Sequence, residues 1–92
     1  MNKGELVEVA ATKAQATQKV VNEVLNALID AITQAVADGE KVTLVGFGSF
    51  EARDRKAREG RNPKTGEKME IPATTVPAFS AGKQFRDAVN RL

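Results

Sequence analysis

The run from Arg53 to Lys68, RDRKAREGRNPKTGEK, constrains the fold most, because it carries many charges and almost no side chain that could fill a core. It holds seven Lys and Arg residues against three acidic ones, whereas residues 1–52 hold four against seven. The run therefore has a net charge of +4, whereas residues 1–52 have a net charge of −3. Such a segment has to lie outside the core, in water or against an anionic partner.

The centre of this run is rich in turn-forming residues. Pro63 fixes φ, Asn62 favours turns, and two glycines, Gly60 and Gly66, permit positive φ. The pattern predicts a long hairpin with its tip near Pro63.

Strand-like residues flank the run, and they predict a ribbon with a basic face. Phe50 and Ala52 alternate with the charged residues Glu51, Arg53 and Arg55. On a strand, this alternation places the charged side chains along one face. A solvated loop is the usual interpretation of a charge run, but a basic two-stranded ribbon suits a nucleic-acid groove.

The size of the chain predicts one domain, residues 1–92, with the arm at approximately 53–76. At 92 residues, folding buries only about 60 to 65% of the surface of the unfolded chain, so dimerisation would help. Cys and His are absent, so neither disulfides nor thiolate metal sites are possible, and we expect no cofactor. The start MNKGELVEVAATK has no apolar run of the signal-peptide kind, and no window is expected to approach the length of a membrane span. We expect a cytoplasmic protein without a membrane partner.

Two helices are predicted in the first half of the chain. Asn2, with Glu5 three residues on, is a predicted cap of a short helix that ends around 13–16. Thr17 is a plausible N-cap for a second, longer helix. The apolar residues expected to share one face of the first helix are Leu6, Val9 and Ala10.

The second helix, from Gln18 to Asp38, has an unusually broad apolar face, and Gly39 supplies its stop. One stripe recurs at steps of four and three residues: Val21, Leu25, Leu28, Ile32 and Ala35. A second set flanks it: Val20, Val24, Ile29 and Val36. The alternative is a helix buried in its own small core. We favour a helix that faces both its own chain and a copy of itself.

Two strands, 41–45 and 49–53, follow, with Gly46-Phe47-Gly48 as the turn. Only the first half of a dinucleotide fingerprint is present, since the third glycine and the following helix are missing. The glycines are turn formers that are expected to bring backbone N–H groups to the surface, where they could bind phosphate.

The last third of the chain predicts an edge strand and a final helix. Pro72 and Pro77 confine the strand 69–79 to a sheet edge or a bulge. Ser80 is the predicted N-cap of the helix, whose shared apolar face is Phe85, Ala88, Val89 and Leu92. The four Phe residues are the chain's aromatic residues, so a small aromatic contribution to the core is expected.

The order and spacing of three motifs closely resemble those of the bacterial histone-like HU/IHF family. These motifs are GFGSF at 46–50, GRNPKTG at 60–66 and PAFSAGK at 77–83, and the resemblance covers essentially the whole chain. It implies an α+β fold in an intertwined homodimer, with a helical base, a three-stranded antiparallel sheet per chain and a protruding β-ribbon arm. It also implies a nucleoid protein that binds double-stranded DNA without strong sequence specificity, and that bends and compacts it. The resemblance implies architectural DNA binding, in which two arms enter the minor groove.

The resemblance also implies roles for individual residues. The four arm arginines match positions that contact phosphates and groove edges, Asn62 matches the tip residue in the groove, and Pro63 matches the wedge between base pairs. Nicked or distorted DNA, in which unstacking costs less, is the expected preferred partner. The implied DNA-binding residues are Lys3, Gly46, Gly48, Ser49, Arg53, Arg55, Arg58, Arg61, Asn62, Pro63, Lys64 and Lys83.

A few positions depart from the family pattern, and other functions stay open. Ser80 stands where many members carry a basic residue, Gln18 precedes Lys19 where a lysine commonly falls one position earlier, and Phe85 replaces a common leucine. A sequence-specific family member and a module that binds acidic proteins or anionic lipid are the alternatives. An enzyme is the least expected class, because the sequence has no His or Cys and no spaced carboxylate pair tied to a nucleophile motif.

Overall fold

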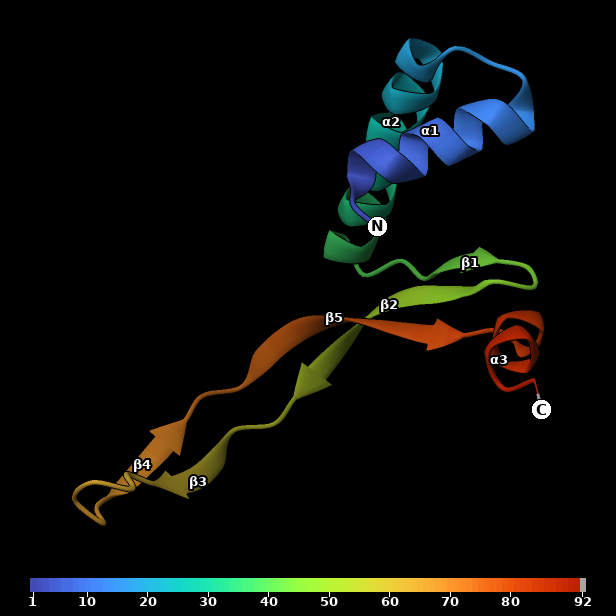
Figure 1. Ribbon diagram of the computed structural model, residues 1–92. Helices are drawn as coiled ribbons and strands as arrows, with labels where there is room; N and C mark the ends of the chain where they lie inside the picture. Colours follow the sequence, from blue (N-terminus) through green and yellow to red (C-terminus); the bar gives the residue numbers. More distant parts are fainter. Residues whose placement is uncertain (92) are drawn as a thin grey trace. The chain divides into compact units, whose positions relative to one another are not determined.

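The computed structural model describes residues 1–91 and has the predicted α+β composition (Figure 1). Two compact units make up the chain, Met1–Gln34 and a second that begins at Ala35. The elements in order are α1 (Lys3–Ala14), α2 (Gln18–Ala37), β1 (Val42–Leu44), β2 (Gly48–Arg55), β3 (Arg58–Arg61), β4 (Lys68–Ile71), β5 (Thr74–Ala81) and α3 (Lys83–Val89). That residues 1–92 act as a single domain stays a prediction.

The caps predicted for the two N-terminal helices are present. The Asn2 side chain accepts a 2.9 Å hydrogen bond from the backbone N–H of Glu5, which satisfies one free donor of α1. Thr17 Oγ1 accepts from the N–H of Val20 at 3.2 Å and so begins α2. Gly39, with φ +87°, follows the end of α2 as predicted.

The face of α1 that carries Leu6, Val9 and Ala10 is not the face that the single chain buries. Val7 and Ala11 are the buried pair, each only 5% exposed, whereas Leu6 is 47% and Val9 39% exposed. Val7 and Ala11 are four residues apart and share a face of the helix, as the 3.6-residue repeat requires. Leu6 and Val9 lie on a face that a single chain leaves uncovered.

None of the 20 residues of α2 is buried, although the helix carries most of the apolar side chains of its region. Leu28, near the middle of the predicted stripe, is 54% exposed. The flanking residues Val20, Val24 and Ile29 are about half exposed as well. A helix buried in the core of its own chain is therefore excluded for the single chain, and the broad face remains free for a partner.

The expectation that no window approaches a membrane span is wrong for α2. By length and composition alone this helix could cross a membrane, with a mean hydropathy of 1.2. Its opposite side is polar, however: Asn22, Glu23, Asn26, Asp30, Thr33 and Gln34. Such an amphipathic helix fits a protein partner better than a bilayer interior.

A three-stranded antiparallel sheet, in the order β1-β2-β5, forms the body of the second unit. β1 is shorter and β2 longer than predicted. The strand predicted at 69–79 is divided into β4 and β5, with Pro72 between them. Pro77 lies in β5 opposite Ala52, and β5 is an edge strand, as this proline predicted. The register places Thr43, Ser49 and Ser80 side by side across the three strands.

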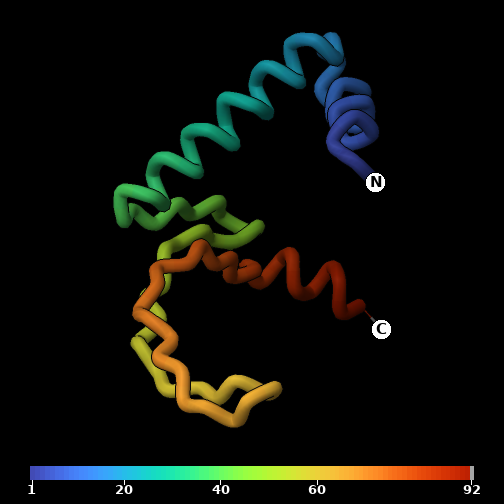
Figure 2. Tube along the Cα trace, turned by 90° about the vertical axis from the view of Figure 1, so that its left-hand side faces the viewer, coloured from blue at the N-terminus to red at the C-terminus, as the bar shows by residue number. Residues whose placement is uncertain are grey.

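A two-stranded ribbon, β3 with β4, carries on from β2 and β5. Arg55 pairs with Thr74, and the next pair is Arg58 with Ile71. Two residues on each strand are therefore left unpaired, and because the number is equal on both strands the register is unbroken. Figure 2 shows the two legs, yellow and orange, running side by side to the tip. The skipped residues on the returning leg include Pro72, which has no N–H to donate to a ladder. The hairpin predicted around Pro63 is confirmed.

The four Phe rings gather where the sheet meets α3, which is more aromatic packing than composition predicted. Phe79 is central, with ring centroids 4.9 Å from Phe50 and 5.4 Å from Phe47. Phe85 of α3 stacks on Phe47 at 5.0 Å. These contacts fix α3 against the turn that joins β1 to β2. Leu92, assigned to the same face of the helix, lies outside the described residues.

The predicted cap of the last helix is wrong. Ser80 lies within β5, paired with Ser49, and α3 begins at Lys83 after Gly82, with no side-chain cap. The strand runs on because Ala81 still pairs with Gly48. Ser80 is therefore a sheet residue whose hydroxyl is available to its neighbours.

Candidate nucleic-acid interface

The tip of the ribbon is a tight turn that presents a proline. Asn62 Oδ1 accepts a 2.9 Å hydrogen bond from the N–H of Lys64, and Asn62 N–H donates to the carbonyl of Glu67 at 2.9 Å. Gly66, at φ +71°, closes the turn by donating to the Asn62 carbonyl at 2.7 Å. Pro63 is exposed between these bonds. Gly60, by contrast, lies inside β3 opposite Met69 and has no turn role.

Basic side chains occupy both faces of the ribbon. Because the register is unbroken, alternation places Arg61 on the same face as Arg53 and Arg55. We call this the arginine face. Arg58 lies on the opposite face, beside Ile71. The predicted basic face is thus confirmed for the arginines of β2, whereas the four arm arginines do not share one face.

On the arginine face near the tip, like charges lie directly opposite each other. Arg61 pairs with Lys68, and Glu59 pairs with Glu70. Like charges across an antiparallel pair are destabilising, by roughly 0.2 to 1 kcal/mol. An anion beside Arg61 and Lys68 would remove one of these repulsions, so this part of the ribbon favours a polyanionic partner.

At the root of the ribbon, Arg53 is held by two neighbours on the same face. Its Nε donates to Glu51 Oε1 at 3.1 Å, and its Nη2 lies 3.1 Å from the same oxygen. Nη2 also donates to Ser80 Oγ at 2.9 Å. The Arg53 side chain is 55% exposed and that of Glu51 30%, so the guanidinium lies fixed at the surface.

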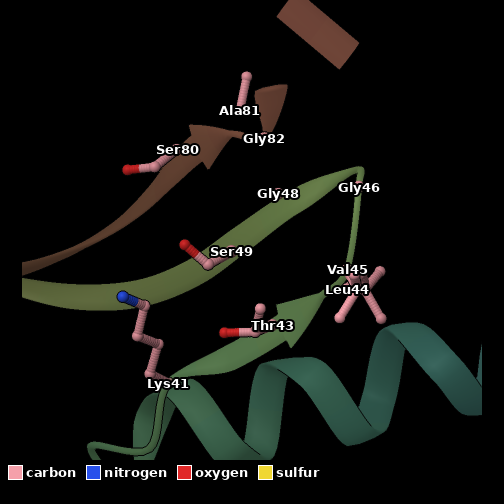
Figure 3. A pocket seen from close by; sticks show the side chains of 10 residues that line it. All are labelled: Lys41, Thr43, Leu44, Val45, Gly46, Gly48, Ser49, Ser80, Ala81 and Gly82. Carbon is pink, nitrogen blue, oxygen red and sulfur yellow. The ribbon is translucent and has the colours of Figure 1, made fainter. Parts of the chain in front are cut away.

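Beside Arg53, the outer face of the sheet forms a shallow hollow of about 210 Å³. Figure 3 shows the hydroxyls of Thr43, Ser49 and Ser80 pointing to one side, together with the ammonium group of Lys41. Hydroxyls and an ammonium group are donors suited to phosphate oxygens. We call these three hydroxyl residues the hydroxyl row.

The glycines of the β1–β2 turn have structural roles. Gly46 has φ +85° in a turn closed by the Phe47 N–H and the Leu44 carbonyl, 2.9 Å apart. Gly48 is buried within β2, yet it also lines the hollow, so a role of its amide in binding phosphate stays a prediction. A Cβ on Gly48 would lie 2.5 Å from the Phe79 ring, which explains why only glycine fits there. Gly46 lines the hollow with Ser49.

The two predicted cations outside the ribbon, Lys3 and Lys83, already have partners. Lys3 donates from Nζ to Asn26 Oδ1, within the helical unit. Lys83, the first residue of α3, forms a 2.9 Å ion pair with Asp87, and both side chains are well exposed. Exposed pairs of this kind are weak, so both ammonium groups stay available to a stronger anion.

Several residues of this surface were missed at the level of sequence. Lys41, Thr43 and Ser80 line the hollow, and Lys68 faces Arg61 across the ribbon. The alternation in KVTLV places Lys41 and Thr43 on one strand face, and this pattern could have identified them as surface neighbours. Their alignment with Ser80 depends on the strand register, which a single sequence does not reveal.

Comparison with known proteins gives consistent matches over the chain's length. The sequence profile of the family described as bacterial DNA-binding protein matches residues 1–90. The DNA-binding protein HU of Nostoc sp. is 68% identical over 89 residues, covering 97% of this chain and 95% of the relative. The HU of Clostridium pasteurianum is 56% identical, covering 99% of this chain and 100% of the relative.

Solved structures match as well. An Anabaena HU–DNA cocrystal structure superposes with a TM-score of 0.92 at 66% identity, covering 100% of both chains. HU from Thermotoga maritima, as its V42I mutant, gives a TM-score of 0.73 at 37% identity, over 98% of this chain and 100% of that one. The resemblance seen in the three sequence motifs therefore extends to the whole backbone.

Proposed function

The chain belongs to the bacterial DNA-binding protein family that includes HU, and from this premise we propose that it is a histone-like architectural protein of the nucleoid. It binds double-stranded DNA as a homodimer, without strong sequence specificity, and bends and compacts it. The two ribbons enter the minor groove, with Pro63 of each tip as a wedge at a base step. Its place is the bacterial cytoplasm, where the chromosome lies.

The exposed face of α2 supports the homodimer. This helix buries no residue within its own chain, and Leu6 and Val9 of α1 are also uncovered. Apolar surface of this extent costs free energy in water and is typical of an obligate interface. A second copy supplies an equal apolar surface under two-fold symmetry.

The tip geometry is the observation that carries the DNA-bending proposal. Pro63 is an exposed apolar ring at the end of a basic ribbon, held in place by the hydrogen bonds of Asn62. Proline has no N–H to desolvate when it inserts between base pairs, and minor-groove architectural proteins use apolar wedges of this kind. Arg61 precedes Pro63 and Lys64 follows it, and contacts of these two cations with phosphates beside the wedge are part of the proposal.

Electrostatics supports binding with little base readout. The cations of the arm and the sheet act on phosphates, which carry no sequence information. We propose contacts from Arg53, Arg55, Arg58, Arg61 and Lys64, with Ser49 and Gly46 at the sheet and Lys3 and Lys83 on the body. Sequence preference in this mode comes from how easily the DNA deforms, so nicked duplexes are the preferred partners.

A binding titration tests the proposal. The protein is titrated into several labelled duplexes of unrelated sequence, both intact and nicked, at several salt concentrations. We expect similar affinities for the intact duplexes, tighter binding to nicked ones, and log K falling by about 0.9 per log unit of salt for each phosphate neutralised. A strong preference for one sequence would identify a sequence-specific member. Binding to acidic proteins or anionic vesicles that duplex DNA does not displace would contradict the proposal.

A further inference from the structure

Glu51 and Arg53 form an ion pair that has no part in the proposed function. Glu51 and Arg53 are two residues apart on β2, so both side chains lie on the arginine face. The Glu51 carboxylate accepts from Nε and lies against Nη2 of the guanidinium, while Ser80 takes a further bond from Nη2. Nη1 takes no part in these contacts.

The same guanidinium borders the surface where a phosphate would lie. Ser80, which accepts from Arg53, belongs to the hydroxyl row and lines the hollow. A phosphate placed over this row would meet Arg53 at one end and Lys41 at the other. It would also meet Glu51, which lies between Ser49 and Arg53 along β2. An anion that approaches Arg53 therefore has to replace the carboxylate or share the cation with it.

We propose that Glu51 is a positioning and affinity-setting residue for DNA binding, which holds Arg53 and competes with the DNA phosphate for its guanidinium. Together with Ser80, the carboxylate keeps the guanidinium at the edge of the hydroxyl row in the free protein. It also neutralises that guanidinium. Binding at the sheet face is then weaker than the number of cations implies, and this face closes on DNA only after a phosphate displaces Glu51. This inference rests on the proposed function.

The exposure of the pair sets the expected size of the effect. Both side chains are reached by solvent, and exposed ion pairs contribute little. We expect Glu51→Gln to tighten DNA binding by about two- to five-fold for each Arg53 engaged. The salt dependence should also steepen, by at most about 0.9 in the slope for each Arg53. Glutamine retains the length of the side chain and a carbonyl acceptor for Nε, so the guanidinium keeps its place.

Asp54→Asn is the matched control. Asp54 is the next residue of β2, on the opposite face, and accepts a 3.0 Å hydrogen bond from Thr75 instead of binding an arginine. The substitution makes the same change in net charge at the same end of the ribbon. We expect it to change affinity by less than about two-fold, as general electrostatics at a screened distance predicts.

The experiment is a double-mutant cycle with Glu51→Gln and Arg53→Ala, measured by fluorescence anisotropy on one intact duplex over a salt series. Thermal melting confirms that each variant is folded. We expect the gain from Glu51→Gln to disappear in the Arg53→Ala background, because the carboxylate acts through this arginine. A gain that persists without Arg53, or one no larger than that of Asp54→Asn, would overturn the proposal. Wild-type protein that fails to bind any duplex would instead reject the proposed function.

Discussion

Gly48 has a structural role that its place in the sequence motif does not reveal. In the sequence it reads as one of two turn glycines that offer amides to phosphate. In the structure it is buried within β2, and the Phe79 ring and the Ser80 carbonyl occupy the space where a side chain would begin. Glycine is required here because the folded sheet leaves no space for a side chain.

Gly48→Ala should therefore lower the stability of the protein. Its Cβ would lie 2.5 Å from Phe79 and 2.6 Å from the Ser80 carbonyl, so the aromatic cluster or the strand has to shift. We expect a loss of about 1 to 3 kcal/mol in the free energy of unfolding, as for other overpacked sites. Denaturant melts measure it. Gly4→Ala, within α1 and with only Asn2 nearby at 3.5 Å, is the control and should be neutral or stabilising; equal losses in both would argue against the steric account.

Among the elements, α2 was the most predictable from sequence and the last strand and helix were the least. The apolar repeat, the Thr17 cap and the Gly39 stop are local signals, and each is present in the structure. Ser80 was assigned to a helix start because serine favours that position. Pairing of β5 with β2 overrides this local preference, and pairing is a long-range property. The strand register that brings Thr43, Ser49 and Ser80 together was beyond prediction for the same reason.

A charge in the apolar face of α2 should abolish the homodimer. Leu28→Glu places a carboxylate on that face, where a second copy would bury it without a partner. We expect loss of the dimer, and of much of the folded structure with it, in sedimentation and circular dichroism at micromolar concentration. Gln34→Glu, on the polar side of the same helix, is the control and should remain dimeric. A wild-type chain that sediments as a folded monomer would contradict the interface.

The ribbon should be mobile without DNA, because an isolated two-stranded ribbon is marginal in water. The opposed pairs Arg61 with Lys68 and Glu59 with Glu70 weaken it further. We expect amide exchange in β3 and β4 to be much faster than in α2, and to slow when DNA is added. Glu70→Lys replaces one like-charge pair with an opposite-charge pair and should slow exchange in the free protein. Exchange in the wild-type ribbon as slow as in α2 would contradict this expectation.

For the whole molecule, affinity and bending are expected to come from different parts. The basic residues of the arms and the sheet attract the phosphates of any duplex, whatever its sequence. The two tips supply the distortion, one wedge for each chain of the homodimer. Arg61→Ala should therefore weaken binding to all sequences alike and reduce the salt slope by about 0.9 for each phosphate that Arg61 neutralises in the wild type. Titrations on several duplexes measure this, and a weakening confined to one sequence would indicate base readout instead.

The most direct test of the central claim compares Pro63→Ala with the wild type in a fluorescence-transfer bend assay, alongside a binding titration. Alanine keeps the charge of the ribbon and removes the wedge, and unstacking a base step costs a few kcal/mol. At saturating protein we expect a smaller bend, a modest loss of affinity for intact duplex and a larger loss of the preference for nicked DNA. Pro77→Ala, in the edge strand β5, controls for the loss of a proline elsewhere. An unchanged bend with Pro63→Ala would show that Pro63 is only a turn residue and that the arms bend DNA by charge alone.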